Sequence, residues 1–141
     1  MQRTFRTSFD PSFAASDHKI MVVDDNAAYL ETISKILESW GYKVLPISCG
    51  MAALEALEEA SPSLVIIDYL MPEMDGLELL RKLREVPAGR NVPAIFLTAS
   101  DVAALRKPAV ALDASAVISK TAPPDDLATA IQVAMHSREA S

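Results

Sequence analysis

The segment LVIIDYLMPEMDG, residues Leu64–Gly76, decides the fold. Its first four residues are apolar, and they run directly into an acid, Asp68. A continuously apolar run predicts a strand that is covered on both faces, as in a parallel sheet. A carboxylate at the edge of an apolar core is costly unless something pairs with it. The segment therefore predicts a buried strand that ends in a polar site.

The same pattern of an apolar run followed by helical spacing occurs five times along the chain, which predicts an α/β fold with a five-stranded parallel sheet and helices on both faces. Proline is tolerated in a strand mainly at a sheet edge, and Pro46 lies in the second run. The flavodoxin-like strand order 2-1-3-4-5 places that run at an edge, so we expect this order. The expected strands are Ile20–Val23, Val44–Ile47, Leu64–Ile67, Ala94–Leu97 and Ala116–Ile118.

Four of the expected helices show an apolar stripe at helical spacing. The stripes are Tyr29, Ile33, Ile36, Leu37 and Trp40 before Gly41; Met51, Leu54 and Leu57 before Ser61 and Pro62; Leu77, Leu80 and Leu83; and Leu127, Ile131, Ala134 and Met135 after Pro124. The remaining helix contains Pro108 in mid-pattern, which removes a hydrogen bond and crowds the preceding turn. We expect that helix either to kink there or to begin at Pro108, as a short or mobile element.

Composition limits the classes of function. The 141 residues predict one domain, and a net charge of −6 argues against direct binding to nucleic acid or to a membrane surface. The single cysteine, Cys49, cannot form an internal disulfide, and we expect it to be buried or half-buried in a cytoplasmic protein. Residues 1–17 form an N-terminal arm with three phenylalanines, interpreted either as a loose leader or as an arm that docks on a hydrophobic patch. Residues 18–141 form the domain.

Polar residues follow the ends of four expected strands. Asp24 and Asp25 follow the first, Asp68 the third, Thr98 the fourth and Lys120 the fifth. Because ligands bind beyond the carboxyl ends of parallel strands, we expect these side chains to converge. Three neighbouring carboxylates stay ionised together only around a cation, and an all-oxygen ligand set suits Mg²⁺. Asp68 would then pair with the metal and with Lys120 and could attack a phosphoryl group as a nucleophile.

Four segments resemble the signatures of the response-regulator receiver domain of two-component signalling. They are IMVVDDN, LVIIDYLMPEMDGLELL, AIFLTAS and AVISK, within a resemblance that covers about Lys19 to Met135. The resemblance implies that Asp68 is the phosphoacceptor, Thr98 the switch hydroxyl and Lys120 the phosphate-pairing lysine. It implies a magnesium site made of Asp24, Asp25, Asp68 and the backbone carbonyl of Leu70.

What the resemblance implies about function is a phosphorelay component, with at most slow self-catalysed phosphorylation and dephosphorylation, rather than an enzyme. Its expected partners are a histidine kinase or histidine phosphotransfer protein and a downstream protein target, and a homodimer is left open. Two positions depart from the family pattern: Val117 replaces the usual aromatic residue, and Thr121 replaces the proline that usually follows the lysine. A cis bond between Lys120 and Thr121 would be strained.

Two other functions compete with this interpretation. The first is an adaptor that keeps the receiver fold and acts without phosphorylation, which the two departures favour. The second is an aspartyl-phosphate hydrolase of the haloacid dehalogenase type. That type carries an Asp-x-Asp pattern after its first strand, which the adjacent pair Asp24 and Asp25 fits poorly.

Overall fold

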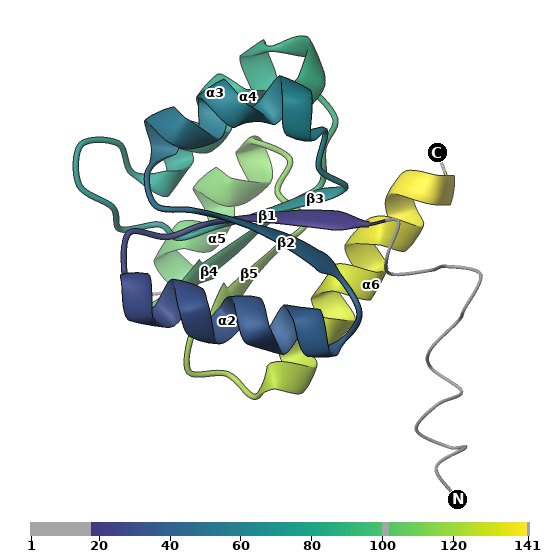
Figure 1. Cartoon of the computed structure of the whole chain (residues 1–141). Helices are drawn as coiled ribbons and strands as arrows, with labels where there is room; N and C mark the ends of the chain where they lie inside the picture. Colours follow the sequence, from purple (N-terminus) through teal and green to yellow (C-terminus); the bar gives the residue numbers. More distant parts are fainter. Residues whose placement is uncertain (1–17, 100–101, 141) are drawn as a thin grey trace, which may run out of the picture.

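Five parallel strands form one sheet at the centre of the molecule (Figure 1). The computed structural model describes residues 18–99 and 102–140, so the N-terminal arm lies outside the described residues. The strand order is β2-β1-β3-β4-β5, as expected from Pro46, which lies in the edge strand β2 and is exposed. The strands are β1 (Lys19–Val23), β2 (Lys43–Ile47), β3 (Leu64–Ile67), β4 (Ala94–Thr98) and β5 (Ala116–Ser119).

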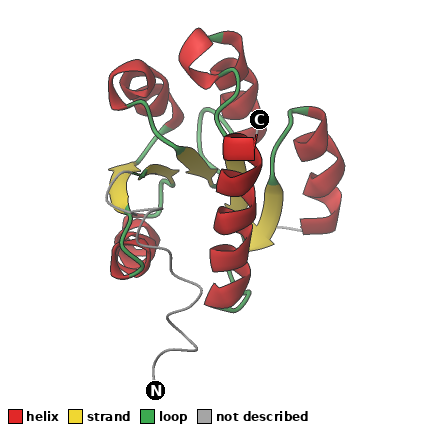
Figure 2. Cartoon of the chain, turned by 90° about the vertical axis from the view of Figure 1, so that its right-hand side faces the viewer, coloured by secondary structure: helices red, strands yellow, loops and turns green. Residues whose placement is uncertain are grey.

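Helices cover both faces of the sheet, as Figure 2 shows from the side. One core lies between the sheet and α3, α4 and α5, and the other lies between the sheet and α2 and α6. The three central strands contribute side chains to both cores, which explains why their sequences are continuously apolar. The helices are α2 (Ala27–Ser39), α3 (Gly50–Ala60), α4 (Gly76–Glu85), α5 (Val102–Ala111) and α6 (Pro124–Ala140), with a short 3₁₀ helix η3 (Pro87–Gly89). Among the described helices, none has both the length and the apolar character that crossing a membrane requires.

The predicted apolar stripe of α6 is confirmed, because all its residues are buried. The prediction of which face of α3 is buried was wrong. Met51 is 60% exposed, whereas Ala53 and Leu57 are buried. The buried face of α3 begins at Gly50, which packs so closely against Met74 that an added Cβ would lie 2.8 Å from its Sδ atom. Small residues therefore define this face, and their weak apolar signal hid it. Cys49, expected to be at least half-buried, is exposed because it occupies the N-cap position in front of α3.

The helix with the internal proline is continuous. α5 spans Val102–Ala111 and holds Pro108 inside it, so the alternative that the helix begins at Pro108 is wrong. Leu105 and Ala109 are its buried residues, one turn apart on the face that packs on the sheet. Pro108 itself is exposed, so its ring lies away from that packed face.

One half-buried arginine ties α4 to the two connections that precede β4 and β5, at the end of the sheet where the strands begin. The guanidinium of Arg84, near the end of α4, donates hydrogen bonds to the backbone carbonyls of Gly89 (2.9 Å), Val92 (2.6 Å), Leu112 (3.1 Å) and Asp113 (3.1 Å). Burial lowers the pKa of Arg84, with the Asp113 carboxylate opposing that effect. These carbonyls precede β4 and β5, so one side chain fixes the start of both strands.

Candidate functional site

Two acidic residues each continue the backbone hydrogen bonding of the sheet by one step beyond their strands, Asp24 after β1 and Asp68 after β3. The amide of Asp24 donates to the carbonyl of Ile47 over 3.0 Å, and the amide of Asp68 donates to the carbonyl of Val23 over 2.9 Å. Asp24 is 2% exposed and Asp68 6% exposed. The backbone thus fixes both carboxylates at the same edge of the sheet, and both side chains are buried.

A third acid, Asp25, completes a cluster with these two. One carboxylate oxygen from each of Asp24, Asp25 and Asp68 lies within 4.8 Å of the others, and Asp25 is exposed to solvent. Oxygen ligands from two buried acids and one open acid fit Mg²⁺, which holds few protein ligands and keeps several waters. The acids predicted to bind a metal are therefore brought together.

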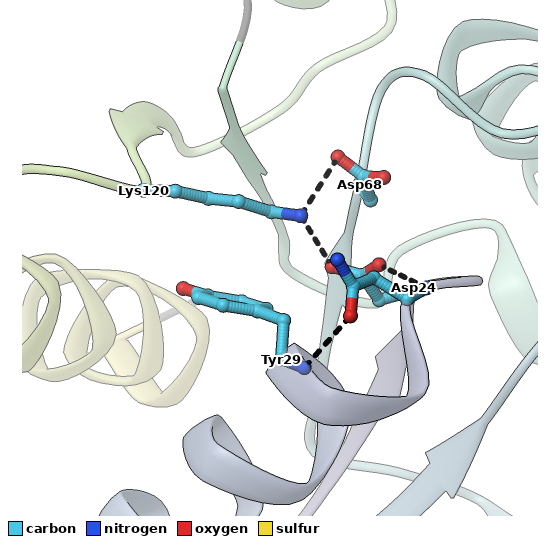
Figure 3. A network of polar contacts seen from close by, with 5 residues as sticks. Asp24, Tyr29, Asp68 and Lys120 are labelled. Carbon is cyan, nitrogen blue, oxygen red and sulfur yellow. Dashed lines mark hydrogen bonds and ion pairs between the residues drawn. The ribbon is translucent and has the colours of Figure 1, made fainter.

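Lys120 supplies the positive charge at this cluster, as Figure 3 shows. Its Nζ lies 2.7 Å from Oδ2 of Asp24 and 3.5 Å from Oδ1 of Asp68. The backbone amide of Lys120 donates to the carbonyl of Thr98 over 2.8 Å, so the register of β4 and β5 sets its position. Asp68 does pair with Lys120, but the shorter contact is with Asp24, which the sequence did not indicate.

The electrostatics of the cluster leave Asp68 easy to protonate. Burial is the largest cause that raises the pKa of Asp68 from its ordinary 3.8 to about 6, the charge of Asp24 adds to the rise, and Lys120 opposes both. The three carboxylates of Asp24, Asp25 and Asp68 and one ammonium leave an excess of negative charge. A bound divalent cation would balance that excess and keep Asp68 ionised.

The remaining predicted residues surround the acids. Thr98, at the end of β4, is fully buried and pairs in register with Ser119. Leu70 lies in the loop after Asp68, with its side chain 59% exposed. This loop closes through a 2.8 Å hydrogen bond from the amide of Gly76 to the carbonyl of Tyr69. A Cβ at Gly76 would lie 2.6 Å from the carbonyl oxygen of Asp68, so only glycine fits here without displacement.

Tyr29 belongs to the site, although its sequence position suggested only a core residue of α2. The ring centroid of Tyr29 lies 4.3 Å from Nζ of Lys120 (Figure 3). Burial raises the pKa of Tyr29 to about 12, and the charges of Asp24 and Asp68 add to the effect, so the phenol stays neutral. A sequence signal existed: Tyr29 stands one helical turn after Asp25, in the first turn of α2.

The two departures from the expected pattern have clear places in the fold. Val117 is 8% exposed and lies opposite Phe96 in the register of β4 and β5. Each peptide bond of the described residues is trans, including the bond between Lys120 and Thr121. The hydroxyls of Ser119 and Thr121 lie 2.8 Å apart and form a hydrogen bond, which organises the turn around Lys120.

Comparison with known families gives a match to the response regulator receiver domain over residues 20–132. Among curated proteins, the chain is 32% identical to the response regulator Rre1 of Synechocystis over 123 residues, which are 86% of this chain and 53% of that protein. It is 42% identical over 80 residues to an uncharacterized 14.6 kDa protein of Leptolyngbya boryana, covering 57% of this chain and 61% of that protein. The chain thus spans less than two thirds of these two relatives.

Solved structures share the fold over nearly their full length. A CheY-like response regulator receiver domain protein from Methanospirillum hungatei matches with a TM-score of 0.79 and 28% identity, over 86% of this chain and 96% of that one. The BeF3-activated N-terminal receiver domain of RstA from Klebsiella pneumoniae matches with a TM-score of 0.76 and 29% identity, over 84% of this chain and 98% of that one.

Proposed function

Because this chain belongs to the family of response-regulator receiver domains, we propose that it accepts a phosphoryl group on Asp68 and signals by changing its contacts with another protein. The observation that carries the proposal is the cluster of Asp24, Asp25 and Asp68, whose carboxylates lie together beside the ammonium of Lys120. The proposed donor is a histidine kinase or a histidine phosphotransfer protein. The proposed signalling partner is a downstream protein target or a second copy of this chain in a homodimer.

In the proposed reaction, a carboxylate oxygen of Asp68 forms a bond to phosphorus while the bond from phosphorus to the donor breaks and its electron pair leaves with the donor. Lys120 would pair with a phosphoryl oxygen, and the hydroxyl of Thr98 would donate a hydrogen bond to another. Asp24, Asp25, Asp68 and the carbonyl of Leu70 would hold Mg²⁺, which neutralises charge on the phosphoryl oxygens when it is bound.

Phosphotransfer from a labelled donor tests the acceptor. Asp68→Asn keeps the shape of the side chain and removes the nucleophile, so it should abolish labelling while the fold remains intact. Asp113→Asn is the matched control, because Asp113 is an exposed acid at the opposite end of β5 and has a φ of 65° that asparagine adopts readily. Undiminished labelling of Asp68→Asn, or equal loss in both variants, would show that the acceptor is assigned wrongly.

The alternative function is that of an adaptor that acts without phosphorylation. The observation that favours it is Val117, because a small β-branched residue stands where the family usually places an aromatic ring that changes position on activation. Beryllofluoride, the activator in the RstA structure, mimics a phosphoryl group and separates the two functions. With Mg²⁺, a phosphoacceptor binds it and shifts backbone resonances of β4 and α5, whereas an adaptor shows no such response.

A further inference from the structure

The ammonium of Lys120 contacts two charged groups and one uncharged group in the site. The ammonium of Lys120 contacts the carboxylates of Asp24 and Asp68, and the face of the Tyr29 ring covers a further side of it at 4.3 Å (Figure 3). The side chain of Lys120 is only 15% exposed as a result. An ammonium over an aromatic face is attracted by the electron density of the ring. The ring therefore replaces part of the water shell that a lysine normally keeps.

The backbone holds the ring at this place. Tyr29 lies in the first turn of α2, and its amide donates to Oδ1 of Asn26, the N-cap residue, over 3.0 Å. The amide of Asn26 in turn donates to Oδ1 of Asp24 over 2.9 Å. Two consecutive hydrogen bonds thus connect Tyr29 to Asn26 and Asn26 to Asp24. The ring of Tyr29 and the carboxylate of Asp24, which both contact Lys120, are therefore positioned together.

We propose that Tyr29 is a positioning residue for Lys120, whose ring holds the ammonium over the phosphoacceptor and so strengthens the binding of a phosphoryl group there. This inference rests on the proposed function, because it assumes that Asp68 carries the phosphoryl group. It adds to that function a residue that acts through Lys120 and does not itself touch the phosphoryl group.

The physical reason lies in the change that Lys120 must make. In the structure its shorter contact is to Asp24, so its ammonium has to shift toward Asp68 when a phosphoryl group is attached. A hydrogen bond would resist that shift, because it is directional. A ring face attracts the ammonium over a broad area, so the ammonium can move across it without losing its partner. Tyr29 thus restrains Lys120 near the site while leaving it able to change its carboxylate partner.

Affinity for beryllofluoride in the presence of Mg²⁺, measured by isothermal titration calorimetry, tests the inference. Tyr29→Leu removes the ring and keeps an apolar side chain, and it should weaken binding by about 2- to 30-fold, the range of cation–π contacts. Tyr29→Phe keeps the ring face and should restore most of the affinity. Tyr42→Leu is the matched control. Tyr42 is also partly buried, but it lies in the connection between α2 and β2 and packs against the core between the sheet and helices α2 and α6.

A double-mutant cycle shows whether Tyr29 acts through the lysine. In a Lys120→Met background, Tyr29→Leu should change the affinity by less than about 2-fold, because the ring has no cation left to hold. In the unaltered chain and in Tyr29→Phe, the methylene protons of Lys120 should also show upfield ring-current shifts that Tyr29→Leu lacks. This second measurement needs neither metal nor phosphoryl mimic.

The outcomes separate this inference from the proposed function. Equal affinity in Tyr29→Leu and in the unaltered chain would overturn the inference alone, as would an equal loss in Tyr29→Phe and Tyr29→Leu. A loss that persists in the Lys120→Met background would also overturn it, since the ring would then act by another route. Failure of the unaltered chain to bind beryllofluoride, with the ring-current shifts intact, would overturn the proposed function and this inference with it.

Discussion

The carboxylate of Asp68 should destabilise the metal-free fold at neutral pH, and removing its charge should stabilise it. Its side chain is 7% exposed, and the attraction of Lys120 does not offset the combined effects of burial and of Asp24 on its pKa. Asp68→Asn keeps the shape of the group and removes the charge. We therefore expect a variant that cannot accept a phosphoryl group and yet unfolds less readily than the unaltered chain.

The magnitude follows from the pKa of Asp68, which is raised from 3.8 to about 6. A raised pKa means that the folded chain holds the proton more tightly than the unfolded chain. The resulting stability is fully present below about pH 4 and is lost as pH rises through about 6. The difference between the two pKa values corresponds to about 3 kcal/mol. Burial of the asparagine amide takes back part of this gain, so we expect Asp68→Asn to be more stable at about pH 7.5 by about 1–3 kcal/mol.

Urea unfolding at about pH 4 and at about pH 7.5, both with a chelator, measures this effect. The two chains should have similar free energies of unfolding at the lower pH and should diverge as the pH rises. Asp113→Asn, which removes an exposed acid at the other end of β5, should show no such divergence. The reasoning is refuted if Asp68→Asn is the less stable chain at the higher pH, or if its advantage is as large at the lower one.

Four further outcomes follow from the structure. Asp25→Ala should lose the Mg²⁺-dependent rise in melting temperature, and a rise that survives in a thermal melt would contradict its role as a ligand. Gly76→Ala places a Cβ 2.6 Å from a backbone oxygen, so we expect a loss of about 1–3 kcal/mol in urea unfolding and weaker binding of beryllofluoride. Arg84→Lys cannot reach four diverging carbonyls and should cost about 2–3 kcal/mol, whereas Arg81→Lys on the exposed face of α4 should cost under about 0.5 kcal/mol. Pro108 removes one helical hydrogen bond from α5, so this helix should open more readily than the others. Beryllofluoride should therefore slow hydrogen exchange in α5, and unchanged protection there with a response elsewhere would count against this.

The strands and their order were predictable because the sheet is buried on both faces. That burial demands continuous apolar runs, and the predicted strands β1 to β5 end within one residue of the observed ones. Pro46 added the edge position of β2, because a proline lacks the amide that an inner strand needs. Asp24 and Asp68 could be placed because each directly follows a strand, and Asp25 is the next residue after Asp24. Backbone geometry alone brings such residues together at the carboxyl edge of a parallel sheet.

What the sequence did not reveal depends on side-chain conformation or on backbone acceptors. The contact of Lys120 with Asp24, shorter than that with Asp68, depends on how a long side chain crosses the site. The ring of Tyr29 over the ammonium depends on the same conformation. The acceptors of Arg84 are carbonyls, which every residue carries, so no pattern of residue types marks them. The face of α3 was misplaced because Ala53 contributes little apolar signal although it is fully buried.

The hydrogen bonds of Arg84 make the two ends of β4 and β5 mechanically unequal. At the starting end, one guanidinium holds the segments that lead into both strands, together with the turn that closes α5. At the finishing end stand Thr98 and Lys120, the groups that would respond to a phosphoryl group. A displacement that begins there therefore cannot slide the strands as a whole, because their far ends are anchored. We therefore expect such a displacement to turn α5 about its carboxyl end, with an amplitude that grows toward Val102 and is smallest beside Arg84.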